Sequence, residues 1–388
     1  MHLRRRDPHP RGARLVGAGR HRHRRRPRAR AHRRLARGAR VDARHHRDGD
    51  ARLVQVPWGF VSARRVYVTG GAGYVGAMLV PRLLALGHHV TVLDLMLYGD
   101  DVIDPHPRLT MVAGDMRDRA LLARTIAGHD TVIHLACISN DPSFELDPSL
   151  GKSINLDAFR PLVEVSRDAG VRRFVYASSS SVYGVKDEPN VTEDMTLEPL
   201  TDYSRFKADC ERILAEYQSP TFTTVTIRPA TVCGYSRRQR LDVVVNILSN
   251  LAYHNRKISV FGGAQLRPNI HMDDMVDAYV AILDAPDEVV AGQIFNAGYE
   301  NQSVEELAMM VKDVMGDDVE LVRTPTNDNR SYHISSERIR RVLGFAPKRS
   351  IRDAIVDMKR AFDRGLLPDS LTDERYFNIK RMQSVKLT

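Results

Sequence analysis

Short apolar runs typical of strands alternate with stretches of helical periodicity from about residue 65 onward. A β-branched and aromatic run at residues 66–68 leads into glycines at positions 70, 73 and 76, and a second apolar run at residues 90–93 ends in Asp94. Between these runs, apolar residues recur at helical spacing up to Gly87: Val75, Leu79, Leu83 and Leu86. The pattern predicts a strand, a glycine turn, a helix and a second strand.

The same alternation continues to about residue 230. Further strands are predicted at residues 109–115, 131–136, 171–184 and 223–230, with helical patterns between them. Strands that alternate with helices form parallel sheets with helices on both faces. We therefore predict an α/β fold built on a doubly wound parallel sheet, in which ligands bind beyond the carboxyl ends of the strands.

The three glycines stand where a dinucleotide site requires them. Gly70 permits a tight turn, Gly73 lets the backbone approach a pyrophosphate, and Gly76 lets the helix pack closely on the strand. Asp94 follows the second strand, where a carboxylate accepts hydrogen bonds from the adenosine ribose and disfavours a 2′-phosphate. The segment predicts a Rossmann-type site for NAD rather than NADP.

The C-terminal part has a different pattern. A helix is predicted within residues 236–250, entered from a basic loop with Arg237, Arg238 and Arg240, and a strand is predicted from residue 257. We predict an NAD-binding Rossmann domain at residues 64–234. Residues 235–388 are expected to form mainly a smaller α/β lobe for the substrate, with some segments returning to the first domain.

The net charge of +10 is unevenly distributed over the 388 residues. Residues 1–60 contain 19 Arg, no Lys and 4 Asp, a net charge of +15, so the rest of the chain carries −5. We expect this Arg-rich leader to be a disordered extension, and translated upstream sequence is one explanation for it. An arm that attracts nucleic acid or membrane is the alternative, but the acidic body argues against a nucleic-acid binder.

Composition is otherwise that of a soluble globular protein, with 43% hydrophobic and 27% charged residues. The sequence has no apolar stretch long enough to span a membrane. Its three cysteines, Cys137, Cys210 and Cys233, lie far apart. They indicate neither a disulfide framework nor a metal site, and they fit a reducing cytoplasm.

The segment TDYSRFK at residues 201–207 places a tyrosine and a lysine one helical turn apart. Alone, the pair Tyr203 and Lys207 is as typical of a helix surface as of a proton-transfer device. Other motifs accompany it in order: TGGAGYVG at 69–76, GDMRD at 114–118, HLA at 134–136, SSSSVYG at 178–184 and RPNIHMDDMVDAY at 267–279. Together, residues 64–365 resemble the extended short-chain dehydrogenase/reductase superfamily, and within it the NAD-dependent nucleotide-sugar epimerase/dehydratase family.

The resemblance implies a set of cofactor contacts. The pyrophosphate would lie on the glycine turn, Asp94 would hold the adenosine ribose, and Asn155 would organise the active-site helix. The remaining implied contacts lie along the adenine and the cofactor cleft. The full implied set is Gly70, Gly73, Tyr74, Val75, Gly76, Asp94, Asp115, Met116, Leu135, Ala136, Asn155, Tyr203 and Lys207.

The same resemblance implies the catalytic residues Ser179, Tyr203 and Lys207. A phenol is a poor base at neutral pH, but a nearby ammonium and the nicotinamide cation favour the phenolate. Tyr203 would then remove a sugar hydroxyl proton while hydride leaves the same carbon. Lys207 would also donate to the nicotinamide ribose, and Ser179 would hydrogen-bond the reacting oxygen; capping of a strand end is the alternative role for Ser179.

The pattern departs from the family at positions that decide the reaction. Ser180 and Ser181 stand where 4,6-dehydratases have an Asp–Glu pair, which disfavours elimination of water. Thr231 stands where an asparagine commonly touches the sugar diphosphate. Ser139, Ser180 and Arg267 are the implied substrate contacts, and the guanidinium of Arg267 suits a diphosphate.

These features predict a cytoplasmic NAD-dependent epimerase of a nucleotide-linked sugar that oxidises and re-reduces a carbon, expected to be C4. A nucleotide-linked keto-sugar reductase is the first alternative, and a 4,6-dehydratase is a further one. A dinucleotide-sensing protein on the same fold is the non-enzyme alternative, which the set Ser179, Tyr203 and Lys207 disfavours. The resemblance implies a homodimer, and no nucleic-acid, membrane or metal partner is expected.

Overall fold

The computed structural model describes residues 63–139, 141–186, 188, 190–326, 333–385 and 387. The Arg-rich leader, and with it the prediction that residues 1–60 are a disordered extension, lies outside the described residues.

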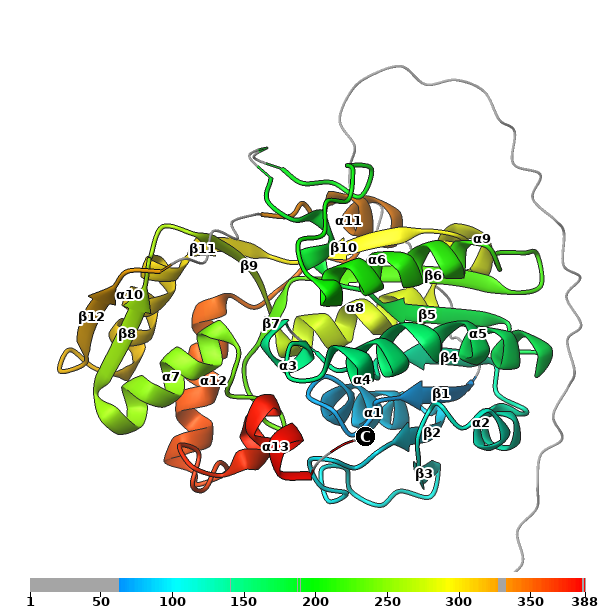
Figure 1. Ribbon diagram of the computed structural model, residues 1–388, viewed down its shortest axis with the longest axis horizontal. Coiled ribbons are helices and arrows are strands. Elements are labelled where there is room, and N and C mark those ends of the chain that lie inside the picture. Colours follow the sequence, from blue (N-terminus) through cyan, green and yellow to red (C-terminus); the bar gives the residue numbers. More distant parts are fainter. Residues whose placement is uncertain are drawn as a thin grey trace, which may run out of the picture. The chain divides into compact units, whose positions relative to one another are not determined.

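A parallel sheet of seven strands forms the centre of the larger part, in the order β10-β6-β5-β4-β1-β2-β3 (Figure 1). Every neighbouring pair is parallel. The predicted doubly wound fold is therefore confirmed. The strands are β1 (Arg65–Thr69), β2 (His89–Asp94), β3 (Leu109–Ala113), β4 (Thr131–His134), β5 (Arg173–Ala177), β6 (Thr223–Pro229) and β10 (Ile294–Ala297).

Helices cover both faces of this sheet because alternate strand residues point to opposite sides. Val66 and Val68 of β1 belong to one apolar core, whereas Tyr67 between them belongs to another. The first core includes α1 (Gly76–Ala85), α8 (Met272–Asp284), α9 (Asp287–Val290) and α11 (Glu337–Leu343). The second includes α2 (Arg119–Ile126), α4 (Pro148–Lys152), the π-helix η1 (Ser153–Asp157), α5 (Phe159–Asp168) and α6 (Asp202–Ala215).

A smaller α/β layer follows in the chain. It contains a three-stranded sheet of β7 (Thr231–Cys233), β9 (Leu266–His271) and β11 (Glu300–Ser303), and a pair of β8 (Lys257–Phe261) and β12 (Glu320–Thr324). Its separate apolar core joins β7, β8 and β12 to α7 (Val244–Asn255), α10 (Val304–Met315) and α12 (Ile351–Asp363). The chain then continues through η3 (Glu374–Tyr376) into α13 (Asn378–Val385).

Strand β10 comes from residues 294–297 and pairs with β6 of the large sheet. Helix α8, from the same half of the chain, shares the first core with α1. The C-terminal half thus contributes to both layers, and the division into a domain at 64–234 and a lobe at 235–388 stays a prediction.

The run at residues 171–184 departs from its predicted form. The strand β5 ends at Ala177, and the serine run continues as the short 3₁₀-helix η2 (Ser180–Tyr183). The Oγ of Ser179 accepts a hydrogen bond from the backbone N–H of Ser181 at 3.1 Å. Serine side chains compete with strand pairing in this way, so the chain turns at the carboxyl end of β5.

Candidate active site

A cavity of about 470 Å³ lies at the carboxyl edge of the large sheet. Its wall contains the glycine turn after β1, residues at the ends of β2, β4, β5 and β6, and part of α13. The volume is typical of small-molecule sites. Its position beyond the strand ends is where doubly wound sheets bind ligands.

The glycine turn supplies one end of the cavity with Gly70, Gly73, Tyr74, Val75 and Gly76. Gly70 has a φ of 73°, and a Cβ there would lie 2.6 Å from the backbone nitrogen of Ala136, so only glycine fits. Val75, which precedes α1, makes no side-chain cap. The N–H groups of Ala77 and Met78 donate to the carbonyl oxygens of Gly73 and Val75. A pyrophosphate would therefore be bound by N–H groups of the turn that precedes them, at the positive end of the helix.

Tyr74 lines the cavity but uses its side chain to connect two parts of the fold. Its hydroxyl donates to the carbonyl oxygen of Gly234 at 2.7 Å, and the Oγ of Ser236 donates to the carbonyl oxygen of Tyr74 at 2.8 Å. The hydroxyl also accepts a hydrogen bond from Asn246 at 2.8 Å. The glycine turn is thus joined to the loop after β7.

Asp94 lies in the cavity wall at the end of β2. Its carboxylate oxygens accept hydrogen bonds from the backbone N–H groups of Ala72, at 3.0 Å, and Met96, at 2.9 Å. Burial raises the pKa of Asp94, and these hydrogen bonds and the charge of Arg238 act against that rise. Each oxygen keeps a second lone pair for a ligand hydroxyl, so the arrangement fits the ribose role implied for Asp94.

The other implied cofactor residues divide into two groups. Asp115, Met116, Leu135 and Ala136 line the cavity. Asn155 is not among the lining residues; it holds the loop after β4, because its amide donates to the carbonyl oxygen of Ile138 and accepts from its N–H, both at 2.9 Å. In the structure Asn155 therefore contacts the cavity wall from behind.

Ser179 and Ser180 lie at the end of β5 and both line the cavity. The expected alternative for Ser179 is also present, since it caps η2 as an acceptor. A hydroxyl that accepts from a backbone N–H still has its own proton to donate. Ser179 also shares a hydrogen bond of 2.9 Å with the hydroxyl of Ser181. The cap and a catalytic role are therefore compatible.

Tyr203 and Lys207 lie one turn apart on α6, but they face different surroundings. Tyr203 is partly exposed and lines the cavity, whereas Lys207 is buried and is not among the lining residues. The ammonium of Lys207 donates to the carbonyl oxygen of Ala177 at 2.7 Å and lies 5.9 Å from the centroid of the Tyr203 ring. Lys207 thus holds the end of β5 from behind the phenol.

The electrostatic environment of Tyr203 differs from the predicted one. Burial raises the pKa of its phenol, Cys137 and Asp141 act in the same direction, and the charge of Arg240 and hydrogen bonding with Ser179 oppose the rise. Among the protein's own groups, the net effect is to favour the neutral phenol. The arginine that opposes this effect belongs to the loop at residues 236–242.

The implied substrate contacts Ser139 and Arg267 also line the cavity, as does Thr231. The three arginines of the loop at residues 236–242, in contrast, lie in different surroundings. Arg237 is exposed and pairs with Asp104, whereas Arg238 and Arg240 are part of the cavity wall.

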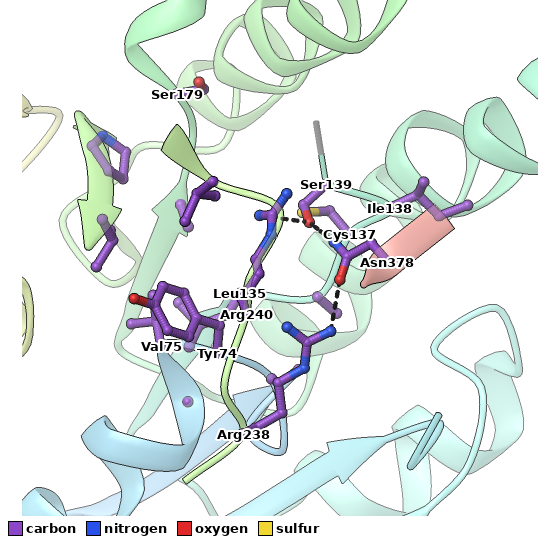
Figure 2. A pocket seen from close by; sticks show the side chains of 18 of the residues that line it. Tyr74, Val75, Leu135, Cys137, Ile138, Ser139, Ser179, Arg238, Arg240 and Asn378 are labelled. Carbon is purple, nitrogen blue, oxygen red and sulfur yellow. Dashed lines mark hydrogen bonds between the residues drawn. The ribbon is translucent and has the colours of Figure 1, made fainter. Parts of the chain in front are cut away.

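Sequence reasoning missed several residues of the wall, including Tyr98, Cys137, Asp141 and Asn378. Figure 2 shows Asn378 and Ser139 between the guanidinium groups of Arg238 and Arg240. The sequence did signal the two arginines, because three arginines stand close together at positions 237, 238 and 240. No motif accompanies Asn378, because its contact with Arg238 joins residues 140 positions apart.

The described residues contain no group of three or more His, Cys, Asp or Glu residues arranged to hold a metal ion. Within the same part of the chain, none of the helices combines the length and apolar character that a bilayer crossing requires.

The chain is similar to nucleotide-sugar enzymes of two kinds. A dTDP-glucose 4,6-dehydratase of Streptomyces griseus is 31% identical over 303 residues, which cover 74% of this chain and 90% of the relative. A UDP-glucose 4-epimerase of Mycolicibacterium smegmatis is 32% identical over 304 residues, 75% of this chain and 96% of the relative. The crystal structure of DesIV, a dTDP-glucose 4,6-dehydratase from Streptomyces venezuelae with NAD bound, matches with a TM-score of 0.72 at 26% identity. The match covers 79% of this chain and 100% of that one.

The fold and the cavity define the class: an α/β enzyme with a dinucleotide site at the carboxyl edge of a parallel sheet. The family model described as "NAD dependent epimerase/dehydratase family" matches residues 66–298. The chain belongs to this family. The resemblance inferred from the motifs is therefore confirmed, together with the prediction of an NAD-dependent enzyme.

Proposed function

We propose that the chain is an NAD-dependent epimerase of a nucleotide-linked sugar, which oxidises and re-reduces one sugar carbon, C4. The observation that carries the proposal is that Tyr203 and Ser179 line the same cavity as the glycine turn and Asp94. A dinucleotide held at the glycine turn and a sugar hydroxyl held at Tyr203 would then share one cavity. Hydride and proton transfer at one carbon require this arrangement.

Each group of residues has a separate task in this proposal. The N–H groups of the glycine turn hold the cofactor pyrophosphate, and Asp94 binds the adenosine ribose. NAD, when bound there, would supply the hydride-transfer chemistry. Tyr203 removes and returns the hydroxyl proton, Ser179 donates a hydrogen bond to the reacting oxygen, and Arg267 binds the sugar diphosphate.

A 4,6-dehydratase is the second candidate, because a dehydratase is among the similar proteins. Elimination of water requires an acid and a base beside the sugar ring, and Ser180 and Ser181 offer neither. Asp141 lines the cavity, and its carboxylate accepts a hydrogen bond from Thr201 at 2.6 Å. Its presence is the specific observation that favours the second candidate.

The test is to incubate the purified protein with a panel of nucleotide sugars and follow the sugar resonances by NMR. An epimerase converts one sugar to its epimer without added cofactor, because hydride returns to the carbon it left. Accumulation of a 4-keto-6-deoxy sugar would replace the proposal with a dehydratase. Steady consumption of reduced cofactor would replace it with a keto-sugar reductase.

The proposal includes a cytoplasmic homodimer. The three cysteines are free, which supports a reducing compartment. The dimer rests on the family resemblance, and light scattering of the purified protein would test it. A mass of one chain, 43.8 kDa, would contradict the dimer.

A further inference from the structure

The C-terminal helix α13 forms part of the cavity wall, through Asn378 and Met382. Asn378 is buried, and its contacts join α13 to the loop at residues 236–242 and to the loop after β4. We propose that Asn378 positions Arg238 and Arg240 as an anion-binding pair, and that the anion is a phosphate of a nucleotide ligand. The identity of the ligand rests on the proposed function, but the pair itself does not.

Asn378 is held by three hydrogen bonds to separate side chains. Its backbone N–H donates to Asp242 at 3.0 Å, its side-chain amide donates to Ser139 at 2.9 Å, and its amide oxygen accepts from Arg238 at 2.6 Å. An asparagine side chain can donate and accept at once. One residue therefore fixes the position of Arg238 relative to Ser139.

Arg240 belongs to the same network through two of these partners. Its Nε donates to Asp242 at 2.5 Å, and its Nη1 donates to the Oγ of Ser139 at 3.2 Å. Ser139 and Asp242 thus each contact both Asn378 and Arg240. Replacement of the Asn378 side chain would therefore remove the hydrogen bond to Arg238 and one contact of Ser139, a partner of Arg240, whereas the backbone N–H contact with Asp242 would remain.

The two arginines keep donors that the described residues do not use. The Nε of Arg238 and the Nη2 of Arg240 are buried and have no hydrogen-bond partner within the described part of the chain. Burial lowers the pKa of Arg238, which reflects the cost of removing a cation from water. The guanidinium lies 3.5 Å from the centroid of the Tyr98 ring, and an aromatic face compensates only part of that cost.

A phosphate is the ligand that these donors suit best. Guanidinium groups bind phosphate oxygens through paired, charge-assisted hydrogen bonds. Asp242 is the carboxylate bonded to Arg240, whereas the side-chain partner of Arg238 is a neutral amide. The carboxylate of Asp242 balances the charge of Arg240, so the charge of Arg238 is the one that a phosphate would neutralise.

Two phosphate groups are possible sources. The cofactor pyrophosphate would lie at the glycine turn, and the diphosphate of a nucleotide sugar would lie toward Arg267. The cavity wall contains all three elements. The chemistry of binding is the same for both sources, so binding of each must be measured separately.

The test compares Asn378→Ala and Asn378→Asp with the native chain by isothermal titration calorimetry. The ligands are NAD and whichever of UDP, dTDP, GDP and CDP the native protein binds most tightly. We expect affinity for at least one ligand to fall by about 10-fold or more, the usual scale for charge-assisted hydrogen bonds. Loss confined to NAD assigns the pair to the cofactor, and loss confined to the nucleoside diphosphate assigns it to the substrate.

The aspartate variant separates positioning from simple packing. It has the shape of asparagine, so a purely structural role predicts a milder effect than that of Asn378→Ala. The proposal predicts that Asn378→Asp loses more ligand affinity than Asn378→Ala, because the new carboxylate neutralises Arg238. Circular dichroism checks the fold, and Arg238→Gln gives a second test if both Asn378 variants unfold.

Asn250→Ala is the matched control. Asn250 is also a buried amide, with hydrogen bonds to Ser370 at 3.0 and 2.6 Å, but it is not part of the cavity wall. The Asn250→Ala substitution should lower stability and leave the affinities for NAD and for the nucleoside diphosphate within a factor of about two of the native values. Affinities of the Asn378 variants within that same factor would overturn the proposal. Nucleotide affinities that fall as expected, in a protein that turns over no nucleotide sugar, would contradict the proposed function alone.

Discussion

Tyr203 and Lys207 lie one turn apart on one helix as expected, but their side chains make different contacts. Tyr203 reaches the cavity, whereas Lys207 is bonded to the carbonyl oxygen of Ala177. Burial raises the pKa of Tyr203, and Arg240 opposes the rise. In the proposed mechanism, Arg240 and the charge of a bound nicotinamide would favour the phenolate that base catalysis requires.

Tyr203→Phe tests the proton-transfer role directly. The substitution keeps the aromatic ring and its packing, and removes the only atom that can carry the proton. Turnover should fall by on the order of 10²-fold or more, the usual scale for a general acid–base group, while NAD affinity stays close to native. Near-native turnover in a protein with a native circular dichroism spectrum would show that Tyr203 does not transfer the proton.

Asp94 accepts a hydrogen bond from the glycine turn, and we propose that it also binds the adenosine ribose. Asp94→Ala removes the ribose acceptors, the charge that repels a 2′-phosphate and the hydrogen bond to Ala72 in the glycine turn. NAD affinity should fall by about 10-fold or more. The preference for NAD over NADP should narrow, as titration with both cofactors will show. A native protein that already binds NADP more tightly would contradict this role for Asp94.

The start of α6 shows how an element positions Tyr203, the proposed acid–base group. Thr201 and Ser204 form a capping box, in which the Thr201 side chain accepts from the N–H of Ser204. The Thr201 hydroxyl also donates to Asp141 in the cavity wall at 2.6 Å. Because Tyr203 lies in the first turn, the cap that begins the helix also fixes the phenol relative to α3 (Asp141–Phe144), the short helix that follows β4.

Strand β4 contains a buried titratable group that the proposed chemistry does not use. His134 is buried, bonded to Thr69 at 2.7 Å and stacked on Tyr176 at 5.7 Å between ring centroids. Burial lowers the pKa of His134 from 6.5 to about 3, and the charge of Lys207 acts in the same direction. The folded chain thus binds fewer protons than the unfolded chain between these pH values.

Stability should therefore fall as the pH falls from about 6.5 toward 3, because protons stabilise the unfolded state there. His134 should contribute on the order of a few kcal/mol to this loss. His134→Phe should be less stable at pH 7, since Thr69 loses its partner, but its free energy of unfolding should vary less over this range. Urea unfolding at several pH values measures both effects, with the exposed His89→Gln as control. A pH dependence that is parallel to the native one would contradict the assignment.

At the scale of the whole molecule, sequence patterns predicted those features of the site that depend on residues close together in the chain. The glycine turn, β2 with Asp94 and the helix of Tyr203 each depend on residues near one another in the chain, and all three are found as expected. The contacts of Asn378 depend on how α13 packs at the far end of the chain, and no local pattern carries that information. The pKa of Tyr203 could not be predicted for the same reason, since Arg240 approaches it only in the folded chain.

The cavity wall extends from the glycine turn near the beginning of the described chain to α13 near its end. A ligand that binds only this native arrangement stabilises every segment whose opening destroys the site. NAD at about 100 times its dissociation constant should therefore slow amide hydrogen exchange by up to about 100-fold where exchange requires that opening. We expect protection both at residues 70–76 and at residues 378–385, measured by mass spectrometry with and without NAD. The exposed face of α10 at Met309, outside the cavity, is the internal control. Protection of the glycine turn with unchanged exchange in α13 would show that the C-terminal helix opens independently of the cofactor site.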